Sequence, residues 1–383
     1  MKILLITEFF TSPEKQIFSG GVETRCFYIA KYLSSQNQVF VICRRRKEEL
    51  KFEQKDNLII YRLGREIQST EANIFSIIDR LIFQFLAFFK GLQLRIDLVE
   101  GSNYICFLPA FFVGFFKRIP KVAWYPDVLK GSWQEQFGLF LGFFGELGEF
   151  IFLKLSWDQF ITISLYVKEK LIKNRVSKNK IKIIACGVDL QLINKSKFIK
   201  KEDQIIVVSR LINYKRVDWT INLINQIREK FPKLKLKIIG IGPEEKKLIF
   251  LTGKLRLNKK VEFVKNIKSM QLYEEIAKSK LLLHPSLVEG FGIVLLEATA
   301  LQTPFIASDI PTSLYLQKQL NSGLVFKKND FDDFLDQTKI ILNNDKEYKR
   351  LQTNGMKNIE YFDWKKLTQD TEEVYKEIVK KLS

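Results

Sequence analysis

The sequence predicts an α/β protein of two domains, each a parallel β-sheet covered by helices. The chain has 383 residues, about twice the usual size of a single domain. Short apolar runs alternate along it with stretches of helical length, and both halves of the chain repeat this pattern. Continuous β-branched runs such as Ile205–Val208 are typical of strands that are buried on both faces of a parallel sheet.

The strands are predicted from short runs rich in valine, isoleucine and leucine, and the longer segments between them are predicted to be crossover helices. In the first half the predicted strands are Lys2–Thr7, Val39–Cys43, Leu58–Leu63, Leu98–Glu100, Lys121–Trp124 and Gln159–Ile163. In the second half they are Gln204–Ser209, Lys235–Ile239, Val261–Phe263, Leu281–His284, Phe305–Ala307 and Gly323–Val325.

A polar, lysine-rich segment, Asn194–Asp203, separates the halves and precedes a new strand. We therefore expect residues 1–192 to form an N-terminal domain and residues 193–383 to form a C-terminal domain. The charged segment 364–383 follows the last predicted strand and reads as a helix. We expect this helix to pack back on the N-terminal domain.

The chain is strongly basic, with a net charge of +19, and the surplus is concentrated. Between Lys154 and Lys268 there are 28 Lys and Arg against 10 Asp and Glu. Such a region favours an anionic partner, for which we expect an anionic membrane surface. A solvated, lysine-rich surface explains the same composition. The stretch contains no recognisable nucleic-acid-binding module, so we expect no nucleic acid partner.

Three segments are unusually rich in phenylalanine: Ile74–Phe89, Asn103–Phe116 and Phe137–Leu153. None reads as a transmembrane helix, because the second is too short and the third carries Glu146 and Glu149. Buried crossover helices and an apolar surface that enters a bilayer interface both explain this composition.

The start of the chain and its cysteines bear on location. The chain starts directly with a strand, and its four cysteines are scattered. We therefore expect a cytoplasmic protein, peripheral at the inner face of the cell membrane.

The strongest chemical signal is a glycine-containing loop within Pro285–Glu297, which follows a predicted strand and opens a predicted helix. Gly290 and Gly292 let the backbone approach a ligand closely. Free N–H groups at the start of the helix would point at an anion, helped by the helix dipole. The amides expected to do so belong to Phe291, Gly292 and Ile293.

Two glutamates flank that loop. Glu289 lies in the loop and Glu297 lies two turns into the helix, roughly 12 Å away at 1.5 Å per residue. This spacing suits the two ends of one extended ligand rather than a pair that shares a proton. Glu297 also falls within the apolar run Ile293–Leu301, and a buried carboxylate is costly without partners.

Two cations follow another predicted strand of the same half. Arg210 offers a planar fork for phosphate oxygens, and Lys215 offers a compact point charge. Such a pair alone is weak evidence. Beside a glycine-bordered helix N-terminus in the same domain, it indicates a site for a diphosphate.

Glu289 and Glu297 form an E-x7-E pattern, and the block His284–Asp309 resembles the donor-site block of glycosyltransferase family 4, the glycosyl transferases group 1. Other segments are similar to further motifs of this family, so that the resemblance is nearly full length. These segments are Gly20–Glu23, Gly187–Asp189, Ser209–Asp218 and Ile239–Pro243.

The resemblance implies a GT-B architecture, in which two Rossmann-like domains with parallel sheets face each other across a cleft. It implies a retaining enzyme that transfers a hexose-type sugar from a nucleotide-diphosphate sugar to a glycan or lipid-linked acceptor. The expected setting is the assembly of cell-surface polysaccharides or glycoprotein glycans. An inactive GT-B scaffold protein and a GT-B nucleotide-sugar isomerase or hydrolase are the alternatives.

The resemblance also implies roles for particular residues. Glu297 would bind the ribose hydroxyls and Glu289 the sugar hydroxyls. Arg210, Lys215 and the amides named above would hold the diphosphate, while Gly21 would belong to the glycine loop of the first domain. No metal or cofactor is expected, since side chains neutralise the phosphates. Asp330–Asp333 has the spacing of a metal-binding DxD motif, but we interpret it as the start of a helix.

The sequence departs from the family at one position. Many members carry a histidine on the acceptor side of the cleft, in the first domain. Here the only histidine is His284, in the second half, and we interpret it as structural. The corresponding region is Trp124–Val128, so that Asp127 is the candidate for orienting the acceptor hydroxyl or the donor sugar. A turn aspartate after Pro126 explains the same residue equally well.

Overall fold

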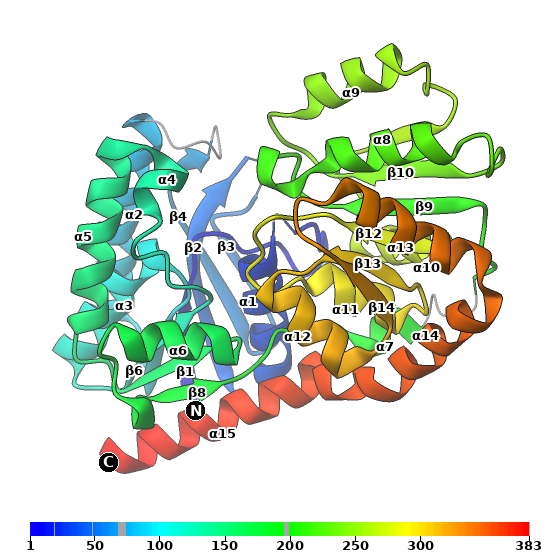
Figure 1. Cartoon of the computed structure of the whole chain (residues 1–383). Coiled ribbons are helices and arrows are strands. Elements are labelled where there is room, and N and C mark those ends of the chain that lie inside the picture. Colours follow the sequence, from blue (N-terminus) through cyan, green and yellow to red (C-terminus); the bar gives the residue numbers. More distant parts are fainter. Residues whose placement is uncertain (19, 48, 68–73, 195–198, 383) are drawn as a thin grey trace. The chain divides into compact units, whose positions relative to one another are not determined.

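The computed structural model describes residues 1–18, 20–47, 49–67, 74–194 and 199–382. They form two compact units (Figure 1). Unit 1 comprises Met1–Cys186 together with Trp364–Ser383, and unit 2 comprises Gly187–Asp363. Each unit is built around a sheet that is wholly or almost wholly parallel, so the predicted two-domain α/β architecture is confirmed.

The sheet of unit 1 has the order β3-β4-β2-β1-β5-β6-β7-β8. All neighbours pair in parallel except β3 and β4, which form an antiparallel hairpin at one edge. The strands are β1 (Lys2–Ile6), β2 (Gln38–Arg46), β3 (Phe52–Lys55), β4 (Leu58–Ile67), β5 (Leu98–Gly101), β6 (Lys121–Tyr125), β7 (Gln159–Thr162) and β8 (Ile181–Ile183). The predicted strands of this half are all present. The sequence analysis missed the two edge strands, β3 and β8, which are short and partly exposed.

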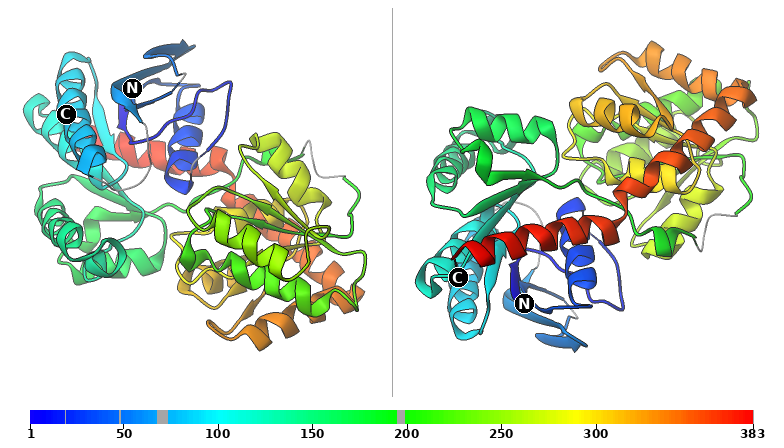
Figure 2. Two further views of the ribbon diagram at one scale, coloured as in Figure 1. Left: turned by 90° about the horizontal axis from the view of Figure 1, so that it is seen from above. Right: turned by 90° about the horizontal axis from the view of Figure 1, so that it is seen from below.

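Helices cover this sheet. Helices α2 and α3 pack against each other, and α3 packs against α5. Helix α15 lies beside α1 within unit 1 (Figure 2), where the rings of Trp364 and Tyr28 stack with centroids 5.9 Å apart. The helices are α1 (Gly21–Leu33), α2 (Ile74–Gln93), α3 (Tyr104–Lys117), α4 (Trp133–Phe137), α5 (Leu139–Lys154), α6 (Leu165–Lys173) and α15 (Trp364–Leu382). No helix of the described residues is long and apolar enough to cross a membrane.

The sheet of unit 2 is wholly parallel, with the order β11-β10-β9-β12-β13-β14. Its strands are β9 (Gln204–Val208), β10 (Lys235–Ile239), β11 (Val261–Val264), β12 (Leu281–His284), β13 (Phe305–Ser308) and β14 (Gly323–Phe326). The chain winds outward from β9 in one direction and then returns to place β12 on the other side of β9. The connections that follow β9 and β12 therefore lead to opposite sides of the sheet from this switch point, which is where open α/β sheets bind ligands.

The main core of unit 2 lies on one face of the sheet, between the strands and apolar residues of α8, α9 and α13. Helices α10, α11 and α12 pack in succession, α10 on α11 and α11 on α12. The helices are α7 (Leu190–Ile193), α8 (Val217–Ile227), α9 (Glu245–Lys254), α10 (Ser269–Lys278), α11 (Ile293–Ala300), α12 (Pro311–Leu320), α13 (Phe331–Asn343) and α14 (Asp345–Asn358). Helix α11 begins where the predicted anion-binding helix was expected.

Candidate functional site

The loops after β9 and β12 are bonded to each other at the switch point of unit 2. The N–H of Leu287, in the β12 loop, donates to the carbonyl of Tyr214, in the β9 loop, at 2.8 Å. Lys215 directly follows Tyr214, and Glu289 lies two positions after Leu287. The loop contact thus brings together residues that are 74 positions apart in the sequence.

Lys215, His284 and Glu289 form a charged cluster at this point. The Lys215 ammonium makes an ion pair with Oε2 of Glu289, and Nε2 of His284 lies 3.0 Å from the same oxygen. Burial would raise the pKa of Glu289, but Lys215 and His284 outweigh burial and hold it well below its usual range. Glu289 is therefore ionised at neutral pH.

The sequence analysis assigned His284 a structural role only. Its contact with Glu289 places it inside the candidate site, at the carboxyl end of β12. The two are five positions apart in the sequence, and the turn between them brings their side chains together. The position of His284 at the end of a buried strand, directly before the glycine loop, was the available signal.

Arg210 occupies the outer part of the β9 loop. Its guanidinium donates to the hydroxyl of Tyr214 at 3.1 Å, and the side chain is exposed. Lys215 is buried, in contrast. The two cations that the sequence placed together thus differ in setting: Lys215 is bonded to a carboxylate, while Arg210 faces solvent with most of its donors available.

Two glycines let the loop after β10 lie directly on the loop after β9. A Cβ on Gly240 would come within 1.8 Å of the Ser209 carbonyl oxygen. One on Gly242 would come within 2.2 Å of the Leu211 carbonyl oxygen. Since backbone atoms cannot yield as a side chain does, any larger residue here would displace the segment that carries Arg210 and Lys215.

The glycine loop after β12 opens helix α11 as predicted. Gly292 is the N-cap residue with φ 83°, in the left-handed region that favours glycine. A Cβ on Gly290 would meet nothing within 4 Å. Among the described residues, no backbone acceptor faces the N–H groups of Phe291, Gly292 and Ile293. The Phe291 side chain is buried, with its ring near Tyr315 and Phe362.

Glu297 is the fifth residue of α11, about one turn into the helix rather than the two turns expected, and is half-buried. Its carboxylate has no hydrogen-bond or ion-pair partner among residues 1–18, 20–47, 49–67, 74–194 and 199–382. Burial alone raises the pKa of its carboxyl to about 8. Glu289 and Glu297, identical in chemistry, are thus driven to opposite protonation states by their surroundings.

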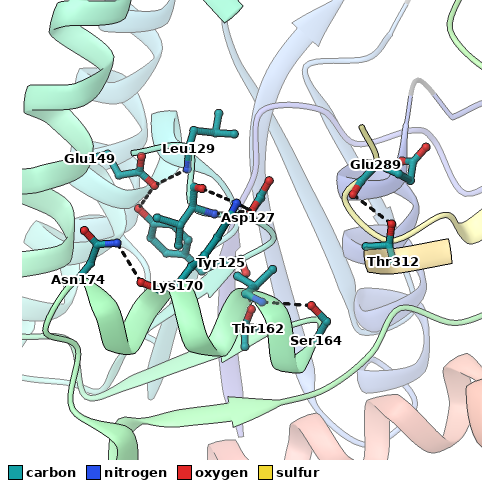
Figure 3. A network of polar contacts seen from close by, with 12 residues as sticks. Tyr125, Asp127, Leu129, Glu149, Thr162, Ser164, Lys170, Asn174, Glu289 and Thr312 are labelled. Carbon is teal, nitrogen blue, oxygen red and sulfur yellow. Dashed lines mark hydrogen bonds and ion pairs between the residues drawn. The ribbon is translucent and has the colours of Figure 1, made fainter. Parts of the chain in front are cut away.

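Asp127 lies in unit 1, just after β6, and is held in place by several contacts (Figure 3). Its carboxylate accepts from the Lys170 ammonium at 2.9 Å and from the N–H of Val128 at 2.8 Å. Its carbonyl accepts from the Tyr104 hydroxyl at 2.7 Å. The figure also shows Glu289 of unit 2, whose carbonyl accepts from the Thr312 hydroxyl at 3.4 Å.

The loop that carries Asp127 is organised by Glu149 of α5. This buried carboxylate accepts from the hydroxyls of Tyr104 and Tyr125, at 3.2 and 3.1 Å, and from the N–H of Leu129, at 3.1 Å. The indole of Trp133 donates to its second oxygen at 2.6 Å. The sequence analysis treated Glu149 only as a charge within an apolar segment. Its partners are scattered along the chain, so no local pattern indicates this role.

Gly21 and Asp330, the remaining predicted positions, both lie at the starts of helices. Gly21 is the first residue of α1, after Gly20 as N-cap. Asp330 caps α13, accepting from the N–H of Asp333 at 3.0 Å, as expected for a helix start. Within the part of the chain that the structure describes, no cluster of His, Cys, Asp or Glu could hold a metal ion.

Two models of known protein families together match nearly the whole chain. The model described as Glycosyltransferase Family 4 matches residues 19–192, and that described as Glycosyl transferases group 1 matches residues 189–358. An uncharacterised glycosyltransferase of Haemophilus influenzae is 28% identical over 44% of this chain and 48% of its own length. The chain spans about half the length of the curated relatives it matches.

Solved structures share the fold. Sucrose-phosphate synthase from Thermosynechococcus elongatus superimposes with a TM-score of 0.81 at 18% identity, over 99% of both chains. HepE of Anabaena, in complex with UDP-glucose, superimposes with a TM-score of 0.76 at 16% identity, over 98% of this chain and 100% of that one. Both are GT-B proteins, so the predicted GT-B fold is confirmed.

Proposed function

Since the chain belongs to glycosyltransferase family 4, the glycosyl transferases group 1, we propose that it transfers a hexose-type sugar from a nucleotide-diphosphate sugar to a glycan or lipid-linked acceptor, with retention at the anomeric carbon. The proposed setting is the assembly of cell-surface polysaccharides or glycoprotein glycans. The observation that carries the proposal is the cluster of Lys215, His284 and Glu289 at the switch point of unit 2.

The diphosphate would lie between the β9 loop and the start of α11. Arg210 supplies a planar fork of donors, and Lys215 keeps two N–H donors beyond the one engaged by Glu289. The N–H groups of Phe291, Gly292 and Ile293 add the positive end of the α11 dipole. HepE of Anabaena, which shares this fold, was solved with UDP-glucose, and this supports a nucleotide-sugar donor here.

These charges would act on the leaving group. As the bond from the anomeric carbon to the diphosphate oxygen breaks, its electron pair passes to that oxygen, and negative charge grows where Arg210 and Lys215 lie. Fixed charges aimed at developing charge are the largest contribution in many enzymes. The acceptor oxygen bonds to the anomeric carbon on the same face, and its proton passes to a phosphate oxygen of the departing nucleoside diphosphate.

The two glutamates would hold the ends of the donor. Glu289 is ionised and oriented by Lys215 and His284, so its remaining lone pairs can accept from sugar hydroxyls. The Glu297 carboxylate, which has no partner among the described residues, would accept from the two ribose hydroxyls. Such contacts would supply the partners that a buried carboxylate needs. Asp127, anchored by Lys170, would orient the acceptor hydroxyl or the donor sugar.

The first experiment is a thermal-shift screen with UDP, GDP, ADP and dTDP in the presence of EDTA. A ligand at about 100 times its Kd stabilises the native state by about 2.7 kcal/mol, so one nucleotide series should raise the Tm clearly. Arg210→Ala should reduce the shift, whereas the matched charge removal Lys247→Ala, exposed on α9, should leave it intact. No shift with any nucleotide in folded protein would favour an inactive scaffold.

Product analysis with the sugar form of the nucleotide that binds then identifies the reaction. A new glycosidic bond on an added glycan or lipid-linked acceptor supports transfer with the proposed site. Free sugar would instead indicate hydrolysis, and an isomerised nucleotide sugar would indicate an isomerase. The anomeric configuration of the product, read by NMR, tests retention.

A further inference from the structure

Helix α5 turns its apolar side outward. The side chains on this side are between 44% and 79% exposed, although they are phenylalanine, leucine and isoleucine. Surface helices normally bury such a stripe against the core. The exposed residues are Leu139, Phe140, Phe143, Phe144, Leu147, Phe150 and Ile151.

The inward side of α5 carries Gly142, Glu149 and Leu153, and its glycines fit closely against α4. A Cβ on Gly142 would come within 2.4 Å of the Cα of Gln134, and one on Gly145 would come within 2.3 Å of the Trp133 ring. Glu149 points inward as well and accepts the hydrogen bonds that organise the Asp127 loop. Helix α5 therefore cannot rotate about its axis to bury its phenylalanines without breaking these contacts.

The apolar surface continues on two more helices. On α2, Leu81, Phe85 and Phe89 are 46–63% exposed, and on α3, Phe112, Phe115 and Phe116 are 41–62% exposed. The ring of Phe88 lies 5.8 Å from that of Phe116 and joins the two helices. We call the exposed apolar residues of α2, α3 and α5 the phenylalanine face. A face of this extent marks an interaction site in a folded protein.

Cations border the phenylalanine face. Helices α2, α3 and α5 each lead from the carboxyl edge of the parallel sheet back to its amino edge, so their C-terminal ends gather at one border. The exposed side chains of Arg95, Arg118 and Lys154 lie there. At this border Lys2, Arg95, Asp97, Phe116 and Lys117 line a hollow.

Cations also lie against the rings of the face itself. The ammonium groups of Lys130 and Lys154 lie 5.1 and 5.7 Å from the centroid of the Phe150 ring. The carboxylates of α5 are engaged by the chain, because Glu146 accepts from the N–H of Gly131 at 2.6 Å and Glu149 from the contacts described above. Lys130 and Lys154 thus place positive charge directly beside the phenylalanines of α5.

We propose that the phenylalanine face inserts into the interface of an anionic lipid bilayer. Aromatic rings then enter the boundary between headgroups and acyl chains, while the bordering lysines and arginines meet lipid phosphates. Self-association fits less well, because a two-fold pairing would bring the same cationic border against its own copy. The inference rests on the exposed side chains and does not depend on the proposed sugar transfer.

Insertion of α5 into a membrane would act on the loop that carries Asp127, because the same helix holds that loop. Glu149 lies on the inner side of α5 and accepts hydrogen bonds from Leu129 and Trp133, whereas Phe143 and Phe150 project from the outer side. One helix thus carries both the membrane contact and the anchor of the loop proposed to receive the acceptor.

The test is sedimentation of the full chain with vesicles of phosphatidylcholine, alone or mixed with phosphatidylglycerol. We expect binding to the anionic vesicles, weakened but not abolished by added salt. The triple variant Phe140→Ser, Phe143→Ser, Phe144→Ser should lose at least about tenfold in affinity, since its apolar contact is reduced. The matched control Phe250→Ser, on α9 and 73% exposed, should bind as the unaltered protein does.

A second measurement reports insertion without relying on loss of function. In Phe140→Trp, the new indole should be quenched by lipids brominated on their acyl chains, more strongly than the native tryptophans are. Absence of binding to anionic vesicles at low salt overturns the proposal. A monomer–dimer change in the triple variant, seen by light scattering without vesicle binding, would assign the face to a second copy. The nucleotide thermal shift, measured on the same variants, tests the donor site separately.

Discussion

At the scale of single residues, the candidate site is defined by two glutamates in opposite electrostatic settings. Glu289 lies against a buried ammonium and an imidazole, which hold its carboxylate ionised. Glu297 lies eight positions further along the chain with no counter-charge, and its pKa rises to about 8. The first arrangement suits a fixed acceptor of hydrogen bonds, and the second suits a group that ionises when a ligand supplies donors.

The Lys215–Glu289 pair should stabilise unit 2 only while both partners are present. Lys215→Met leaves a partly buried carboxylate without its cation, and the cost should approach the roughly 3–5 kcal/mol found for fully buried pairs. The double variant Lys215→Met, Glu289→Gln should recover most of that loss, because no uncompensated charge remains. Thermal unfolding of the wild type, of the single variants Lys215→Met and Glu289→Gln, and of the double variant measures the coupling. Additive losses in the double variant would show that the pair contributes nothing as a pair.

Glu297 should make nucleotide binding depend on pH. Its folded pKa of about 8 lies above the ordinary 4.5, so the folded state holds a proton that the unfolded state has released between these two values. Through this group, the free energy of unfolding therefore falls as pH rises across that window. Ribose hydroxyls favour the ionised form, so nucleotide affinity should rise as pH approaches about 8. Isothermal titration at several pH values measures this, and Glu297→Gln should flatten the slope. A slope unchanged in that variant would assign the effect to another group.

At the scale of elements, the site depends on how closely three loops of unit 2 approach one another. The loop after β10 rests on the loop after β9 through Gly240 and Gly242, and the loop after β9 is bonded to that after β12 through Tyr214 and Leu287. Gly240 and Gly242 lack side chains and therefore allow the backbone of the β10 loop to contact the backbone of the β9 loop.

Gly242→Ala should therefore weaken nucleotide binding without removing any ligand-binding group. The added methyl would lie 2.2 Å from the Leu211 carbonyl oxygen, so the segment with Arg210 and Lys215 must shift. We expect a loss of at least about tenfold in affinity, since a shift of about 1 Å is costly at a positioned site. Gly253→Ala is the matched control, because its Cβ would meet only Asn258, at 4.0 Å. Equal affinities for the two variants in titration would contradict this account.

Much of the fold was predictable from the sequence, because strands buried on both faces of a parallel sheet consist of continuous apolar residues, as in Ile205–Val208. The exposed hairpin strand Phe52–Lys55 could not be predicted in this way, since it is mostly polar and pairs only along one edge. Glu289 and Lys215 were predicted singly from their loops. Their ion pair was not predicted, because it depends on two loops separated by 74 residues. Burial of Glu149 against distant tyrosines escaped prediction for the same reason.

At the scale of the whole molecule, α15 belongs to unit 1 although it follows all of unit 2 in the sequence. Its Tyr375 hydroxyl donates to Glu100 of β5 at 2.6 Å, and Arg25 of α1 makes a buried ion pair with the same carboxylate. Tyr28 stacks on Trp364 nearby. The centre of unit 1 is thus assembled from segments at both ends of this sequence.

Tyr375→Phe should destabilise unit 1 selectively. It removes one hydrogen bond to a buried carboxylate, which costs about 1–3 kcal/mol, while the apolar packing of the ring remains. We expect a lower unfolding midpoint for unit 1 in calorimetry. The nucleotide-induced shift, which reports on unit 2, should persist. A loss of nucleotide binding with an unchanged midpoint would place the role of Tyr375 outside unit 1.

The placement of α15 has a consequence for how the protein is made. A ribosome synthesises all strands of unit 1 first, yet the segment that donates to Glu100 emerges only after Asp363, when unit 2 has been translated in full. Unit 2 is contiguous in sequence and has every one of its strands available before unit 1 is complete. During translation, unit 2 is therefore expected to finish folding before unit 1, although synthesis of unit 1 starts first.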